Sequence, residues 1–166
     1  MATDTPAQNF RLLRKFIPSS LQPYLRGLRK RLQTSERPTQ EPFRTVFPYT
    51  QVHRFRQENL LRIAREIDDR AIPGAIVECG VLDGGTAAIM AFGTKRSDRP
   101  LHLFDSWEGL PAATEKDGDA EMWAGDVVGS PRRVAAVLRA LQISFSRVNF
   151  HKGWLTRHFQ KQISTR

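Results

Sequence analysis

Three short apolar runs alternate with two helix-like stretches in the second half of the chain, and this alternation limits the folds open to it. Residues 75–79, 101–105 and 147–153 are rich in β-forming residues, whereas residues 85–95 and 131–141 have the composition of helices. Strand, helix, strand, helix, strand is typical of a parallel sheet with right-handed crossover connections. We therefore predict an α/β fold with an open, Rossmann-like parallel sheet of about three strands.

A basic helical arm precedes this pattern. Residues 1–45 carry nine Lys/Arg and three Asp/Glu, a net charge of +6, whereas residues 46–166 carry seventeen against fourteen, a net charge of +3. We treat the first range as arm and linker and the second as the N-terminal part of the domain. A basic helix can hold an anionic surface or a partner, or it can be a solvated helix that packs on the domain or on a second subunit; we expect no nucleic-acid partner. Four leucines at spacings of 4, 3 and 4 form one apolar helix face suited to a homodimer: Leu21, Leu25, Leu28 and Leu32.

A proline-rich segment follows the arm. Residues 34–48 contain three prolines and no periodicity, which predicts a loop or linker. An apolar stripe then predicts a helix from about 51 to 69. Near the other end of the chain, Ser130 as N-cap and Pro131 as the first helical residue predict where the last helix begins.

Composition excludes several classes of protein. No apolar run approaches the roughly 18 residues that a membrane-spanning helix needs, and the N-terminus lacks the apolar core of a signal peptide, so we expect a cytoplasmic protein. The single cysteine, Cys79, excludes an internal disulfide framework and a multi-cysteine zinc site, and its place on a strand predicts a small buried hydrophobe. The four histidines show no metal-ligand spacing, so we predict no metal site.

The stretch Val77–Thr86, VECGVLDGGT, places a glycine-rich turn between the first strand and the next helix. Ligands of open parallel sheets bind at the carboxyl ends of strands, where the next helix presents its positive end. The spacing of Gly80, Gly84 and Gly85 does not match the dinucleotide fingerprint G-x-G-x-x-G, and no G-K-[ST] of a P-loop is present. Glu78 before the turn fits a ligand with a positive end, such as S-adenosylmethionine. A tight turn that binds no ligand is the alternative.

A second acidic residue ends the second strand. Asp105 can accept hydrogen bonds from both ribose hydroxyls of a nucleoside, as acidic residues do at this place in nucleotide-binding α/β folds. Aspartate is also a common turn residue, so a role in the turn alone stays open.

Two blocks, IPGAIVECGVLDGGTAAIMA and LHLFDSWEGLPAATEKDGD, together resemble the macrocin O-methyltransferase family (TylF/MycF type). The resemblance extends over about residues 46–160. It implies an S-adenosylmethionine-dependent enzyme with the class I methyltransferase fold, acting on a sugar hydroxyl of a glycosylated natural product or glycan. Trp107 stands where the family usually has phenylalanine. Leu82 and Asp83 replace the commoner Trp-Arg pair, at positions that we expect to face solvent and tolerate change.

The resemblance also implies which residues bind the cofactor. The turn would hold the methionine half, and Asp105 would hold the ribose with Ser106 beside it. Thr50 either closes over the methionine end or caps a helix. Trp154 either lies near the adenine or packs in the core. The residues implied in the turn are Glu78, Gly80, Val81, Gly84, Gly85 and Thr86.

Family members have about seven strands in the methyltransferase sheet, and this chain supplies three, so the resemblance implies a truncated and inactive fragment. The acidic residues that bind Mg²⁺ and deprotonate the sugar in the full-length family would follow residue 166. We therefore assign no catalytic residue, and neither His151 nor His158 is placed as a base. Without a fourth strand, residues 75–79 would form an exposed sheet edge. The alternative is a non-catalytic nucleoside-binding or protein-interaction module that uses the basic N-terminal helix.

Overall fold

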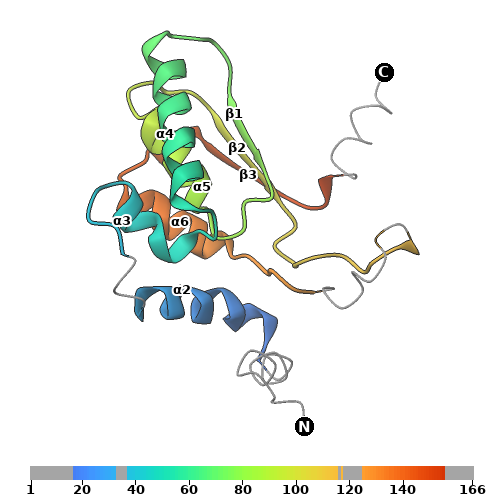
Figure 1. Cartoon of the computed structure of the whole chain (residues 1–166). Helices are drawn as coiled ribbons and strands as arrows, with labels where there is room; N and C mark the ends of the chain where they lie inside the picture. The colour runs from blue at the N-terminus through green and yellow to red at the C-terminus, as the bar shows by residue number, and fades with distance from the viewer. Residues whose placement is uncertain (1–16, 33–36, 116, 118–124, 156–166) are drawn as a thin grey trace, which may run out of the picture.

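The structure, a computed structural model, is built around a three-stranded parallel sheet (Figure 1). The strands lie in the order β1-β2-β3, so strands that are consecutive in the chain are neighbours in the sheet. The predicted α/β fold with an open parallel sheet is confirmed. The strands are β1 (Ile76–Cys79), β2 (Leu101–Asp105) and β3 (Val148–Lys152). The residues that the structure describes are 17–32, 37–115, 117 and 125–155.

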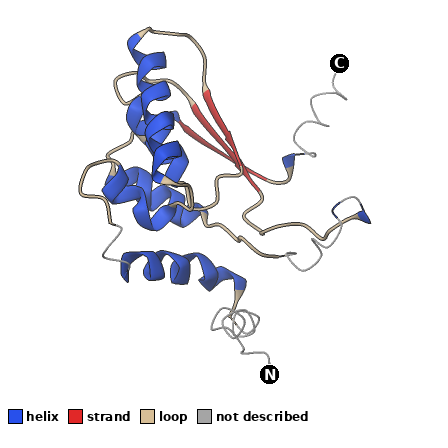
Figure 2. Ribbon diagram, viewed as in Figure 1, coloured by secondary structure: helices blue, strands red, loops and turns tan. Residues whose placement is uncertain are grey.

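Three helices lie to one side of the sheet (Figure 2). Their positions agree with the sequence prediction, although the first helix begins a few residues later than expected. The last helix begins as predicted, because the Ser130 hydroxyl accepts a hydrogen bond from the Arg133 N–H at 3.4 Å and Pro131 occupies the first turn. These helices are α4 (Arg54–Asp69), α5 (Gly85–Gly93) and α6 (Pro131–Ala140).

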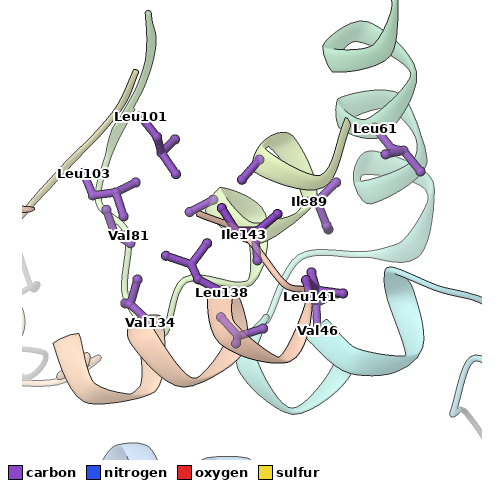
Figure 3. Close-up of a cluster of buried hydrophobic side chains, with 14 of the residues drawn as sticks. Val46, Leu61, Val81, Ile89, Leu101, Leu103, Val134, Leu138, Leu141 and Ile143 are labelled. Atoms are coloured by element: carbon purple, nitrogen blue, oxygen red, sulfur yellow. The ribbon is translucent and has the colours of Figure 1, made fainter. Parts of the chain in front are cut away.

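The core lies between the helices and the sheet (Figure 3). Alternate residues of a strand point to opposite faces. In β2, Leu101 and Leu103 are accordingly buried, whereas His102 and Phe104 are only half-buried. The helices contribute apolar residues to the same cluster: Ile89, Val134, Val137 and Leu138. This packing fixes the carboxyl ends of the strands beside the start of α5.

The opposite face of the sheet is uncovered within the described part of the chain. Val77 is 56% exposed, and Cys79 is exposed as well. The prediction that Cys79 is buried is therefore wrong, because strand residues two apart share a face and no helix among the described residues covers this one. In the described sheet β1 pairs with β2 alone, so it is an edge strand, as the sequence predicted.

The second half of the segment predicted as a loop is helical. Helix α3 (Phe43–Val46) runs directly into the 3-10 helix η2 (Phe47–Tyr49), and Phe43, Val46 and Phe47 are buried. The loop prediction is wrong here because helical segments this short, placed between prolines, are too brief to show a periodic pattern.

Helix α2 (Gln22–Leu32) follows the short 3-10 helix η1 (Ser19–Leu21) and lies below α3 and α6 in the view of Figure 1. The sequence predicted this helix and its leucine face. The leucines point to solvent, and Leu32 is 73% exposed. Helix α2 instead docks through its other side, where Pro23 and Gly27 are buried. No helix among the described residues is both long and apolar enough to cross a membrane.

Arg147 holds the C-terminal end of α5 in place. It lies at the end of the 3-10 helix η4 (Phe145–Arg147), is buried, and donates to the carbonyls of Ala91 at 2.6 Å, Thr94 at 2.8 Å and Ser97 at 3.1 Å. The last carbonyls of a helix lack intrahelical partners and carry partial negative charge, so a cation there is stabilising. Burial lowers the pKa of Arg147, yet a guanidinium stays protonated in proteins.

Candidate functional site

The chain passes from β1 into α5 through a turn at the carboxyl end of the strand. Gly80 (φ +85°) and Gly84 (φ +83°) both adopt the left-handed backbone conformation, which glycine reaches without steric cost. The Gly80 N–H donates to the Phe104 carbonyl at 2.8 Å. A β-carbon on Gly80 would meet no atom within 4 Å. The backbone at Gly80 therefore faces open space that a ligand can enter.

Glu78 lies at the end of β1, directly before this turn. The Thr86 hydroxyl donates to its Oε1, whereas Oε2 is buried without a hydrogen-bond partner among the described residues. Burial, with a smaller contribution from the charge of Asp105, raises the pKa of Glu78 to about 7, although the Thr86 hydroxyl and the Ala87 backbone N–H act to lower it. A buried carboxylate oxygen with no partner is costly, and a cationic group placed beside it would remove that cost.

Asp105 ends β2 and organises two turns. Its Oδ2 accepts from the Leu82 N–H at 2.8 Å, and its Oδ1 accepts from the Trp107 N–H at 2.7 Å. Beside it Ser106 is buried, and its hydroxyl accepts from the Glu108 N–H at 3.2 Å. The turn role of Asp105 is thus present. Each carboxylate oxygen has a second lone pair, and binding of a ribose stays a prediction.

Two of the three glycines of the turn are explained by packing. A β-carbon on Gly84 would lie 2.9 Å from the Val134 side chain of α6. One on Gly85 would collide with Thr50 and would lie 2.8 Å from the Tyr49 carbonyl oxygen. The sequence alone treats the three glycines alike, whereas the structure separates one beside open space from two at close contacts.

Thr50 is buried against the start of α5. Its hydroxyl accepts from the Val52 N–H at 3.1 Å, which is a local turn contact. His53, not Thr50, occupies the N-cap position of α4, so the prediction of a helix cap is wrong. The prediction that Thr50 closes over the methionine end stays a prediction.

Leu82 is held at every polar group of its backbone. It has a left-handed conformation (φ +56°), which is unfavourable for a residue with a β-carbon. Its N–H is bound by Asp105, and its carbonyl accepts from the Trp107 indole Nε1 at 3.2 Å and from the Ser130 N–H at 3.2 Å. Phenylalanine has no donor for this contact, so the tryptophan at position 107 contributes to the turn. Val81, which precedes Leu82, is buried in the core.

Asp83 overturns the expectation that the centre of the turn faces solvent. It is 1% exposed, and its Oδ2 lies 2.8 Å from Nη2 of Arg26 in α2 and 3.3 Å from Nε of Arg133 in α6. The expectation was wrong because α2 covers this side of the turn. Burial raises the pKa of Asp83, and the charges of Arg26 and Arg133 act in the opposite direction. Arg26 and Asp83 are 57 positions apart, so no local spacing in the sequence relates them.

The remaining candidate residues lie elsewhere. Trp154 is half-buried after β3 and is not a member of the apolar core cluster; its place near an adenine stays a prediction.

Nε2 of His151 lies 2.9 Å from Nδ1 of His102 on the uncovered sheet face, where the His151 ring stacks on Phe104. His158 lies outside the described residues. Within the described ranges, no three metal-ligating side chains gather into a metal site.

Comparison with solved structures shows which class of protein shares this fold. The solved structure of the O-methyltransferase NovP is similar, with a TM-score of 0.58 and 23% identity, over 84% of this chain and 66% of that chain. The calicheamicin methyltransferase CalS11 is similar with a TM-score of 0.54 and 18% identity, over 98% of this chain and 65% of that chain. No curated protein sequence matches significantly. The fold is therefore of the methyltransferase type.

A sequence model of the macrocin-O-methyltransferase (TylF) family matches residues 8–163. The chain belongs to this family, and the resemblance seen in its two sequence blocks is confirmed. It spans about two thirds of the length of the two solved structures that it matches.

Proposed function

We propose that the chain binds S-adenosylmethionine at the turn between β1 and α5 and serves methyl transfer to a hydroxyl of a sugar-bearing small molecule. Family membership supports this reaction class. The observation that carries the proposal is the buried Glu78 Oε2, which has no hydrogen-bond partner among the described residues, two positions before Gly80, whose backbone faces open space.

The residues present fit this cofactor. Its ammonium group would take the free lone pairs of Glu78, and the N–H groups at the start of α5, which have no intrahelical partners, suit its carboxylate. Asp105 would accept a ribose hydroxyl, with Ser106 beside it, and Trp154 would lie near the adenine. When bound, the cofactor supplies an electrophilic methyl group on its sulfonium. The chain's own residues position the nucleoside and keep water from Glu78.

For the acceptor we propose a chemical class alone, a hydroxyl of a sugar-bearing small molecule. A hydroxyl needs a base or a metal to lower its pKa before it attacks a methyl group. The described residues gather no metal site, so Mg²⁺ is proposed for the longer members of the family and no step is assigned to it in this chain. The catalytic residue stays unassigned.

Titration with S-adenosylhomocysteine tests the proposal without requiring turnover. We expect the native chain to bind it at a 1:1 ratio by calorimetry at pH 8. Glu78→Gln should weaken binding by about tenfold or more, because the neutral amide cannot pair with the ammonium. Glu58→Gln, at an exposed residue of α4, is the matched control and should bind like the native chain. Absence of binding to a folded native chain would contradict the proposal.

A second candidate is an interaction module built on α2. Its leucine face is exposed, and exposed apolar helix faces mark binding surfaces. We propose a second copy of the chain as the partner, packed helix against helix. Analytical ultracentrifugation should then give a dimer that Leu28→Glu converts to a monomer, whereas a native monomer at high concentration would exclude this candidate.

A further inference from the structure

Asp83 lies in the middle of the glycine turn and is enclosed by arginines from two helices. Arg26 donates to its Oδ2 through Nε at 3.2 Å and Nη2 at 2.8 Å, and Nε of Arg133 lies 3.3 Å from the same oxygen. The crevice between α2 and the turn, lined by residues that include Tyr49 and Leu82, has no room for a water molecule. Asp83 therefore joins α2, α6 and the turn, and it is not open to a ligand.

Arg133 is fixed by its own contacts. Its Nη2 donates to the Pro48 carbonyl at 2.6 Å, and its guanidinium lies over the rings of Tyr49 at 4.5 Å and Tyr24 at 5.8 Å. A β-carbon at Gly27 would collide with this guanidinium. Helix α2 can therefore reach the turn because it has glycine where it crosses Arg133.

Arg26 also reaches the segment that supports the turn. Its Nη2 donates to the Val128 carbonyl at 2.9 Å. Two residues later, the Ser130 N–H donates to the Leu82 carbonyl. One side chain of α2 thus contacts both Asp83 in the turn and the loop that leads into α6. The left-handed Leu82 lies next to Asp83, and such a conformation persists only where its surroundings hold it.

We propose that Arg26 is a positioning residue for the nucleoside site, and that it couples docking of α2 to the shape of the glycine turn beside Gly80 and Glu78. This inference rests on the proposed function. Arg26 acts through Asp83 and does not need to touch the ligand. Coupling between two events is reciprocal, so the ligand and the docked helix stabilise each other by the same factor.

The test uses the full chain, S-adenosylhomocysteine and three variants. Calorimetry at pH 8 should show about tenfold weaker binding for Arg26→Met. Arg26→Lys should recover part of the affinity, because an ammonium can pair with Asp83 but cannot also span to Val128. Arg29→Met removes the same charge from an exposed position of α2 and should bind within about twofold of the native chain.

Hydrogen exchange in α2 separates coupling from a general loss of stability. The ligand should slow exchange of α2 amides in the native chain by about the factor that Arg26→Met loses in affinity, and it should have little effect in that variant. Equal binding by the native chain and Arg26→Met, or no ligand effect on α2 in the native chain, would overturn the inference alone. Failure of the native chain to bind would overturn the proposed function, and the inference with it.

Discussion

Both its place in the sequence and the burial of its side chain make Glu78 the residue proposed to bind the ligand. Its pKa of about 7 means that the carboxyl is half ionised near neutral pH. A ligand ammonium binds the ionised form, so we expect affinity for S-adenosylhomocysteine to rise as pH increases from 6 to 8. Below pH 7 the affinity should fall by up to about tenfold per pH unit, because binding then releases a proton.

Calorimetry in buffers of different ionisation enthalpy measures that proton release directly. Glu78→Gln should show weak binding that does not change with pH. Equal affinity of the native chain at pH 6 and pH 8 would contradict the assigned role of Glu78.

The same carboxyl makes the free energy of unfolding depend on pH. Its pKa is raised in the folded chain from 4.5 to about 7, so its contribution is fully favourable below pH 4.5 and is lost as pH rises to about 7. Without ligand, native stability relative to Glu78→Gln should fall across this window by up to about 1.4 kcal/mol per pH unit. Urea unfolding at pH 5 and pH 8 gives the free energy of unfolding of both proteins. The amount by which the variant is more stable than the native chain should be larger at pH 8 than at pH 5.

Substitutions at two glycines of the turn should affect ligand binding and stability differently. Gly85→Ala places a methyl group against Thr50 and the Tyr49 carbonyl, so it should lower the free energy of unfolding by about 2 kcal/mol or more. Gly80→Ala meets no atom and carries only the strain of its left-handed backbone, about 1–2 kcal/mol, but it fills the space proposed for the ligand. Urea unfolding and ligand titration of both variants test this. Unimpaired binding by a folded Gly80→Ala would place the ligand elsewhere.

At the scale of elements, the sheet and its helices were predictable because their patterns are local. Strand alternation, the helix 131–140 with its Ser130 cap, and the glycine turn all show in a window of a few residues. Helices α3 and η2 were missed because they are shorter than any periodic pattern. The role of Arg147 was missed because its three carbonyl partners lie about 50 positions earlier in the chain.

That buried arginine supports a prediction about α5. Arg147→Met keeps the apolar length of the side chain but leaves the carbonyls of Ala91, Thr94 and Ser97 without their donor. We expect a loss of about 3 kcal/mol in the free energy of unfolding, measured by urea denaturation. Arg132→Met on the exposed side of α6 is the matched control and should change stability by less than about 0.5 kcal/mol. Similar losses in the two variants would show that Arg147 does not hold the helix end.

At the scale of the whole molecule, the candidate site is only partly readable from the sequence. Glu78, Gly80 and Asp105 lie together because parallel strands end at the same edge of a sheet, and that could be predicted. Packing of the basic helix on the domain was one of the expected alternatives, but its contact with Asp83 could not be predicted, because Arg26 and Asp83 are 57 positions apart. At Asp83, therefore, the expectation of a solvent-facing position that tolerates change is wrong.

The described sheet also leaves one face and the β1 edge uncovered. Parallel sheets are normally covered on both faces. The binding experiments on this chain therefore need a check of folding, and thermal unfolding in the presence and absence of ligand provides it. Binding to the folded state should raise the unfolding temperature as ligand concentration rises.

A crystal structure of the chain with S-adenosylhomocysteine is the most direct test of the central claim. We predict the ligand ammonium within hydrogen-bond distance of Glu78 Oε2, with the ligand passing Gly80 and the ribose beside Asp105. A ligand bound at any other place, or an Oε2 still without a partner in the bound complex, would contradict the assignment of this turn as the nucleoside site.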